Sequence, residues 1–301
     1  MWLRYFIIIT TALLLYFYLT HNAALLHKLA ETSPITISKL LILYSLWFGT
    51  LALILQACLR ICRQNIPTME NLILNAYSIF SNYLFPGQSG PVIRGIYLKG
   101  RYKVALRNFI FVTLLYYLAY AGVSVILLVG GMRSWWQTIL GILLFSTGAF
   151  IGARSYARKQ HINIIGLDLS LENVAFLLFA TCLQAICQIA IYYVELSSVA
   201  TGLKVGQVIS YTGAANFALF VSLTPGAVGI RETFLFFSEN LHHITGSAIV
   251  AANILDRSTF IVFLVLVFSA LLVVRGKYIF SIKKEMDEIS SELPDAQQVQ
   301  I

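Results

Sequence analysis

The chain has 301 residues, of which 58% are hydrophobic and 11% are charged, and its mean hydropathy is +0.79. Soluble domains carry about 25% charged residues, so this composition excludes a soluble globular protein and indicates an integral membrane protein. The formal net charge is +8. The cations stand in short segments beside apolar runs, which indicates membrane topology and argues against a nucleic-acid partner.

The first half of the chain predicts three membrane spans and one interrupted segment. The spans are expected at residues 5–20, 40–59 and 106–129. Residues 71–98 are apolar but broken at Pro86-Gly87, and each arm is shorter than the ~20 residues that a full crossing needs. We predict that this segment forms a re-entrant hairpin, which enters and leaves the membrane on one side.

The second half repeats the same order of elements. Its spans are expected at residues 135–153, 173–196 and 248–274. Two apolar arms, 205–223 and 230–241, precede the last span and flank a second Pro-Gly break. The predicted fold is therefore an all-α polytopic membrane protein with about six full spans and two opposed re-entrant hairpins.

The repeated order divides the chain into two related halves. They cover about residues 1–129 and 135–280, and together they form one integral membrane domain over 1–284. The remaining residues, 285–301, are acidic and rich in Gln, which predicts a disordered polar tail.

Both breaks carry the same short motif, P-G-x-x-G, and an arginine follows each copy. The residues that define the breaks are Pro86, Gly87, Gly90, Pro225, Gly226 and Gly229. Pro lacks a backbone N–H group and Gly adopts angles closed to other residues, so a helix is expected to end here. Paired breaks in corresponding halves indicate a transporter's binding site, although simple helix kinks are an alternative.

The distribution of basic residues predicts the orientation. Most of the 21 Lys and Arg residues fall in segments that the layout above places on one side of the membrane. The positive-inside rule assigns that side, with both termini, to the cytoplasm. The first hairpin then opens to the cytoplasm and the second to the outside, which is an inverted repeat.

Charged and amide side chains near the breaks are the candidates for substrate binding. They are Arg94, Asn216, Arg231, Glu232, Asp256 and Arg257. Charges in a membrane are costly and usually mark function, and Arg231-Glu232 is interpreted as an ion pair directly after the second break. Arg94 either lines the site or anchors its arm at the membrane surface by snorkelling.

Other polar residues in the apolar segments have structural alternatives. Asp256 and Arg257 share a helix face with Asn253, so they either contact substrate or form a polar network between helices. Gln184 and Gln188 are interpreted as hydrogen bonds between helices. The pair His242-His243 is expected to be solvated in an outer loop.

Signals for catalysis are missing from the sequence. It contains no nucleophile elbow, no phosphate-cradling loop and no H-E-x-x-H motif. The four cysteines lack the spacing of a metal site. We therefore expect no enzyme activity, no metal and no cofactor.

The second break carries a family resemblance. Residues 222–232, which read SLTPGAVGIRE, resemble the transmembrane, flippase-like region of lysylphosphatidylglycerol synthases, and residues 82–90 with Arg94 are similar to that family's first motif. The resemblance covers roughly residues 1–280. In two-domain members it implies a membrane half that moves an aminoacylated phospholipid and a soluble half that makes it. This chain is expected to be a stand-alone member that lacks the synthase.

The resemblance and the charges together predict an inner-membrane translocase for a phospholipid or a lipid-linked headgroup. Arg94 and Arg231 would attract a phosphate, while Glu232 and Asp256 would balance them or meet an amino group. The expected partners are membrane lipids with phosphate-bearing headgroups. Two alternatives stay open: a non-transporting accessory protein for a lipid- or glycan-modifying enzyme, and a secondary transporter of small solutes.

Overall fold

In a computed structural model of the chain, the structure describes residues 32–84, 89–131, 167–221, 227 and 229–292, together with the isolated residues 141 and 148. Within these ranges the chain forms helices and no β-strand. The helices are α3 (Pro34–Ile61), α4 (Thr68–Leu84), α5 (Ser89–Tyr102), α6 (Leu106–Gly130), α8 (Leu171–Ser197), α9 (Val205–Val221), α10 (Ile230–Phe237), α11 (Glu239–His242) and α12 (Gly246–Glu292).

Four of these helices are long and apolar enough to cross a membrane. They are α3, α6, α8 and the part of α12 from Gly246 to Leu271. They confirm the spans predicted over 40–59, 106–129, 173–196 and 248–274. The other two predicted spans, 5–20 and 135–153, lie outside the described residues, apart from 141 and 148.

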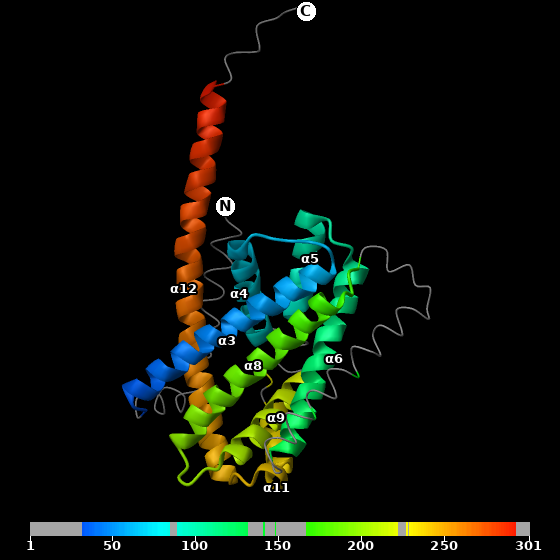
Figure 1. The fold of residues 1–301 in the computed structure, drawn as a ribbon. Helices are drawn as coiled ribbons and strands as arrows, with labels where there is room; N and C mark the ends of the chain where they lie inside the picture. The colour runs from blue at the N-terminus through cyan, green and yellow to red at the C-terminus, as the bar shows by residue number, and fades with distance from the viewer. Residues whose placement is uncertain are drawn as a thin grey trace, which may run out of the picture.

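The C-terminal helix is longer than the sequence pattern indicates. A membrane domain ending at residue 284 and a disordered tail over 285–301 were expected, but α12 continues to Glu292. Figure 1 shows this end of α12 projecting beyond the other helices. Residues 293–301 lie outside the described range.

Both Pro-Gly segments separate two helices that pack against each other. α4 contacts α5 across the first break, and α9 contacts α10 across the second. Pro86, Gly87, Pro225 and Gly226 lie outside the described residues. The helices on either side are described, and because the two members of each pair pack against each other, neither pair forms one continuous helix.

The last glycine of the motif serves a different purpose in each copy. Gly90 lies so close to α4 that a Cβ atom would meet Ser78 and Asn82, and its N–H donates to Asn82 Oδ1 at 2.7 Å. Gly229 adopts φ +83° at the start of α10, where its N–H donates to Glu232 Oε2 at 2.8 Å. Close approach requires glycine at Gly90, and the left-handed backbone favours it at Gly229.

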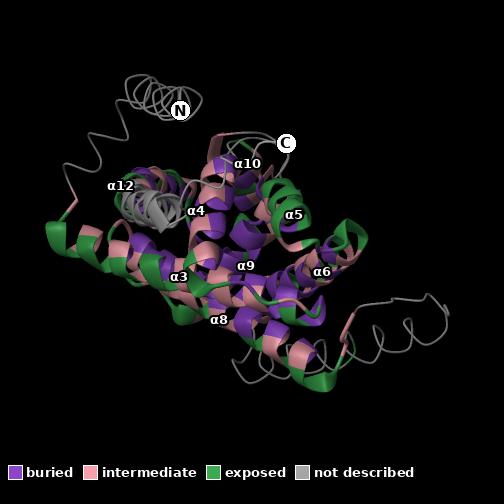
Figure 2. Ribbon diagram, turned by 90° about the horizontal axis from the view of Figure 1, so that it is seen from above, coloured by how far each residue is buried: buried purple, intermediate pink, exposed green. Residues whose placement is uncertain are grey.

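The helix contacts of the two halves correspond. The contacts α3–α4, α4–α5 and α5–α6 match α8–α9, α9–α10 and α10–α12, and α3 also packs on α8. Figure 1 shows α4 and α5 toward one end of the bundle and α9 and α11 toward the other. In the perpendicular view, α4, α5 and α10 lie on one side of the α3–α8 pair (Figure 2).

Two large hydrophobic clusters, with a small one between α6 and α8, form the core of the described residues. One surrounds the first half of α3, the end of α8 and helices α9, α10 and α12, and includes Tyr211 and Leu235. The other surrounds the end of α3, the start of α8 and helices α4 to α6, and includes Leu98 and Phe109. The long helices α3 and α8 contribute to both clusters, so they join the two ends of the bundle.

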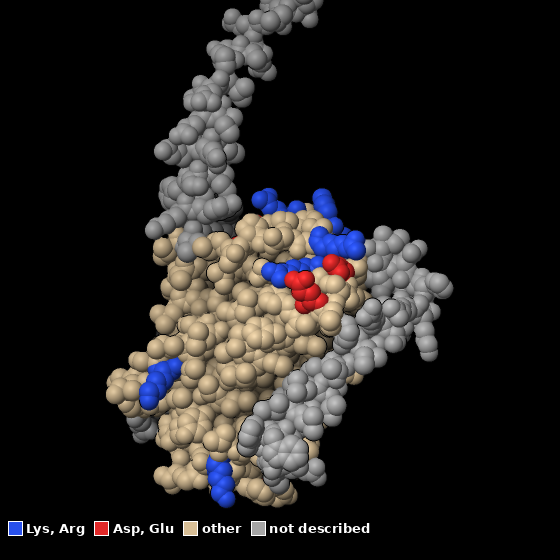
Figure 3. Space-filling view, viewed as in Figure 1, with Lys and Arg blue, Asp and Glu red and all other residues tan. Residues whose placement is uncertain are grey.

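The surface separates into apolar and charged regions. Figure 3 shows Lys and Arg gathered at one end, over a broad flank with very few charges. The basic residues of this end are Arg60, Arg63, Lys99, Arg101, Lys103 and Arg107, whereas Lys39 and Lys204 lie at the opposite helix ends. Many large apolar side chains on the flank are exposed, including Leu114 and Phe179. This pattern fits a flank covered by lipid chains.

Candidate functional site

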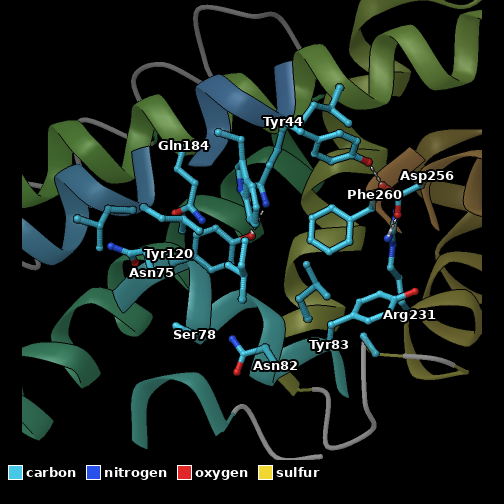
Figure 4. Close-up of a pocket in the computed structure, with 18 of the residues that line it drawn as sticks. Tyr44, Asn75, Ser78, Asn82, Tyr83, Tyr120, Gln184, Arg231, Asp256 and Phe260 are labelled. Carbon is cyan, nitrogen blue, oxygen red and sulfur yellow. Dashed lines mark hydrogen bonds and ion pairs between the residues drawn. The ribbon is translucent and has the colours of Figure 1, made fainter. Parts of the chain in front are cut away.

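A cavity of about 260 Å³ lies between the two broken helix pairs. Its wall contains residues of α3, α4, α5, α6, α8, α9, α10 and α12. The lining combines tyrosine rings from α3, α4, α6 and α8, amides from α4 and α8, and the guanidinium groups of Arg94, Arg231 and Arg257. Figure 4 shows the amides of Asn75, Asn82 and Gln184 across the cavity from Arg231 and Asp256.

Arg231 binds a carboxylate on another helix. It is 6% exposed, and its Nη1 donates a short hydrogen bond to Asp256 Oδ2 of α12. Its guanidinium carbon also lies 5.2 Å from the centre of the Tyr192 ring, a cation–π contact. The Nε and Nη2 groups of Arg231 are buried without a hydrogen-bond partner among the described residues.

Asp256 joins this pair to two further buried groups. The Tyr44 hydroxyl of α3 makes a short hydrogen bond with Asp256 Oδ1 and lies 3.0 Å from Glu195 Oε1 of α8. Tyr44 is 4% exposed and Glu195 is 1% exposed. Four helices therefore meet at one polar chain, which runs from Arg231 through Asp256 and Tyr44 to Glu195. Figure 4 shows the part from Arg231 to Tyr44.

A second ion pair links the same two helices, α10 and α12. Arg257 donates to Glu232 Oε1 through Nη2 and, at 3.1 Å, through Nε. Because the other Glu232 oxygen accepts from the Gly229 N–H, this carboxylate holds the start of α10 against α12. Arg257 lines the cavity, whereas Glu232 does not.

The expected ion pair between Arg231 and Glu232 is wrong. Each residue pairs instead with a partner on α12, Arg231 with Asp256 and Glu232 with Arg257. Successive residues of a helix point about 100° apart and do not face each other, so adjacency in the sequence did not imply contact.

Arg94 lies in the cavity wall. Its Nη1 donates to Asn75 Oδ1 at 3.5 Å, and its Nε is buried without a partner in the described part of the chain. None of the ion pairs formed by the described residues includes Arg94. The neighbouring cations of α5, Lys99 and Arg101, lie at the exposed end of the helix instead.

The amide side chains connect helices, as the sequence predicts for Gln184 and Gln188. The Tyr116 hydroxyl of α6 donates to Gln184 Oε1 at 3.0 Å, and Gln188 Nε2 donates to the Tyr120 hydroxyl at 3.0 Å. Asn216 of α9 donates to Gln188 Oε1 at 2.9 Å. Asn216 is fully buried and does not line the cavity, so it supports Gln188 from behind.

His242 is buried, contrary to the expected solvated loop. One ring nitrogen, Nε2, lies 3.0 Å from the Leu235 carbonyl oxygen, while Nδ1 accepts from the Ile244 N–H at 3.1 Å. These two bonds require the neutral tautomer with its proton on Nε2. His243 is the exposed member of the pair.

Sequence reasoning missed Tyr44 and Glu195. Tyr44 resembles any aromatic residue of an apolar span, and nothing local shows that it faces a carboxylate. Glu195 had a visible signal, because it is an acidic residue inside the predicted span 173–196. Among the described residues, no group of three or more His, Cys, Asp or Glu side chains is placed to hold a metal.

The comparison with protein families places this geometry in context. The family model of the lysylphosphatidylglycerol synthase transmembrane region matches residues 1–268. The chain belongs to this family. No curated protein matches the chain.

Membership of the lysylphosphatidylglycerol synthase transmembrane family, together with the four apolar helices, shows a multi-pass membrane protein and indicates a lipid-related role. The matched region includes every residue of the cavity wall, from Tyr44 to Phe260.

Proposed function

We propose that this protein is an inner-membrane translocase that moves a phospholipid or a lipid-linked headgroup between leaflets, without catalysing a reaction. The observation that carries the proposal is that Arg94 and Arg231 line the cavity and that each keeps guanidinium donors without a partner among the described residues, Nε and Nη2 of Arg231 and Nε of Arg94. Buried donors normally have partners, and a phosphate oxygen is the acceptor that suits them best.

The arrangement of the helix breaks supports translocation through this cavity. Asn82 and Tyr83 lie at the end of α4, next to the first break. Ala227 lies in the second break and Arg231 at the start of α10, so the cavity is bordered by both breaks. The corresponding contacts of the two halves support an inverted repeat in which α4–α5 and α9–α10 are re-entrant hairpins that open to opposite sides. Such pairs allow alternating access to a central site.

The charge distribution supports the orientation. Six of the described basic residues lie at the end from which α4 and α5 enter the bundle, and Lys39 and Lys204 lie at the other end. The positive-inside rule then assigns the α4–α5 end to the cytoplasm, and with it the C-terminus, because α12 ends on that side (Figure 1). The same rule, applied to the first predicted span, also assigns the N-terminus to the cytoplasm.

The direct test is a leaflet-resolved lipid assay. The purified full-length chain is reconstituted into vesicles that contain a fluorescent phosphatidylglycerol, and a membrane-impermeant reductant quenches the label in the outer leaflet. We expect quenching to continue beyond the outer-leaflet fraction in proteoliposomes and to stop there in protein-free vesicles. Equal quenching in both would refute translocation of this lipid and favour the accessory-protein alternative.

A further inference from the structure

We infer that Glu195 is a proton-binding site, and that protons bound there accompany the anionic headgroup through the cavity. The proton site rests on the geometry of the buried polar chain, and its coupling to headgroup transport rests on the proposed function. It concerns the driving force of transport, which the cavity lining alone does not specify.

The contacts of the Tyr44 hydroxyl indicate where a proton is bound. The hydroxyl has one hydrogen, yet a carboxylate oxygen of Asp256 and one of Glu195 both lie within hydrogen-bond distance of it. If both carboxylates are ionised, only one of them receives that hydrogen. If Glu195 is protonated, its own O–H donates to the Tyr44 oxygen, which in turn donates to Asp256. The protonated form satisfies every contact in the chain.

The surrounding charges also favour a proton on Glu195. The titratable or charged groups that face it are Tyr44 of α3, Tyr192 of α8, Tyr211 of α9, Arg231 of α10 and Asp256 of α12. Arg231 is the one cation among them, and it is paired with Asp256. No Lys or Arg of the described chain forms an ion pair with Glu195. An ionised Glu195 would be a buried carboxylate without a cation, which costs far more than a neutral acid.

Counting the charges of the site shows how a proton and an anion are linked. The cations are Arg94, Arg231 and Arg257, and the carboxylates are Glu195, Glu232 and Asp256. With all six ionised the site is neutral and has no net attraction for an anion. With Glu195 protonated it carries one positive charge, which a phosphate-bearing headgroup neutralises. Each ligand therefore strengthens the binding of the other, and this coupling is reciprocal.

This coupling would make the headgroup and the proton cross the membrane together, in the same direction. A headgroup that binds with a proton on Glu195 and leaves when that proton is lost moves with the proton gradient. Ionisable residues inside a membrane domain often form such proton sites in transporters. Glu195 acts through charge and through Tyr44, since it does not line the cavity and does not touch the headgroup itself.

Infrared spectroscopy tests the proton site without requiring transport. The full-length protein at neutral pH should show the carbonyl stretching band of a buried protonated carboxyl group. Glu195→Gln should remove that band, and Glu172→Gln, a change at an exposed residue at the start of the same helix, should leave it. A band that persists in Glu195→Gln would overturn the assignment. Gln is the neutral isostere of the protonated acid, so the variant should fold, and a thermal melt checks this.

The fluorescent phosphatidylglycerol assay with an imposed pH gradient tests the coupling. In the wild type, flipping in the direction of proton flow should become several-fold faster, while Glu195→Gln should flip at one rate with and without the gradient. Wild-type flipping that ignores the gradient would overturn the coupling and leave the translocase standing. Loss of the infrared band in Glu195→Gln without any wild-type flipping would leave the proton site standing and refute translocation of this lipid.

Discussion

At the scale of single residues, two ion pairs join α10 to α12, and the cation is on α10 in one pair and on α12 in the other. Arg231 binds Asp256 and Glu232 binds Arg257, so each helix contributes one cation and one anion at adjacent positions. The side chain of Arg231 is 7% exposed and that of Asp256 is 13% exposed. Removing one partner of such a pair leaves a charge without compensation, whereas removing both does not.

A double-mutant cycle separates the structural role of this pair from binding. Arg231→Gln and Asp256→Asn should each destabilise the protein by about 3–5 kcal/mol, and the double variant should recover most of that loss. Lipid flipping should be lost in the double variant as in Arg231→Gln, because both lack the guanidinium donors of Arg231. Thermal stability and flipping are measured for all four proteins.

The surface pair Arg101–Glu70 is the matched control for that cycle. Its N···O distance is 3.9 Å and the Arg101 side chain is 65% exposed, so Arg101→Gln should change stability by less than about 1 kcal/mol. A fully active Arg231→Gln, Asp256→Asn double variant would contradict a headgroup role for this pair.

The stability of the protein should fall with decreasing pH because of His242. Burial lowers the pKa of His242 below its ordinary value of about 6.5, and Nδ1 must stay unprotonated to accept from Ile244. The unfolded chain therefore binds this proton first as the pH falls, and stability should decrease from about pH 6.5 downward until the lower folded pKa is passed. Thermal midpoints between pH 7.5 and 5 measure this slope.

Substitution identifies the residue responsible for the slope. His242→Gln should flatten the dependence on pH. His243→Asn, a change at the exposed neighbour with φ 53°, should keep it, because Asn tolerates that backbone conformation. An unchanged slope in His242→Gln would show that another group titrates.

The cations of the site could be predicted from the sequence, but their partners could not. Arg94 and Arg231 stand out because they follow helix breaks in an apolar chain, which is a local pattern. The contacts of Asp256 with Tyr44 and Arg231 join residues 212 and 25 positions apart. Which side chains meet across helices depends on helix rotation and packing, and a single sequence does not specify either.

At the scale of secondary-structure elements, α6 and α9 approach each other unusually closely. A Cβ atom on Gly213 would fall on backbone atoms of Ser124 and Leu128, and Ser210 Oγ donates to the Leu128 carbonyl at 2.7 Å. Small residues allow such contacts between membrane helices. This contact fixes the incoming arm of the second broken pair against a spanning helix.

Gly213→Ala should therefore destabilise the protein by about 1–3 kcal/mol, since backbone atoms of α6 must move to accept the methyl group. Gly100→Ala provides the comparison, because this helical glycine of α5 has open space around it. Alanine there should be neutral or stabilising by up to about 1 kcal/mol. Equal thermal midpoints for the two variants would contradict the close α6–α9 contact.

The elements themselves follow from the sequence more reliably than the site does. Hydropathy predicts the four described spans and Pro-Gly predicts both helix ends, because each signal is contained in a short stretch of chain. The structure extends α12 further than the sequence predicts. Residues 285–292 are acidic and contain no Gln, and they remain helical because helix propensity continues beyond the core.

At the scale of the whole molecule, the two ends of the bundle differ in charge, and this difference predicts sidedness. Lys99 and Thr201 are exposed at opposite ends. In a variant without the four native cysteines, Lys99→Cys should react with an impermeant thiol reagent only after the cells are permeabilised. Thr201→Cys should react in intact cells. Labelling of both positions in intact cells would contradict the opposed hairpins.

The central claim is that a phosphate-bearing headgroup passes through the cavity between the two broken helix pairs. Arg94 tests it most directly, because this cavity residue forms no ion pair within the described chain that its removal would disrupt. The measurement is the leaflet-resolved flipping of fluorescent phosphatidylglycerol by the wild type, Arg94→Gln and Arg101→Gln, the last being an exposed residue of the same helix. A charged hydrogen bond contributes about 1.5–3 kcal/mol, so Arg94→Gln should flip at least about tenfold more slowly while Arg101→Gln matches the wild type. Wild-type flipping by a folded Arg94→Gln variant would contradict passage through this cavity.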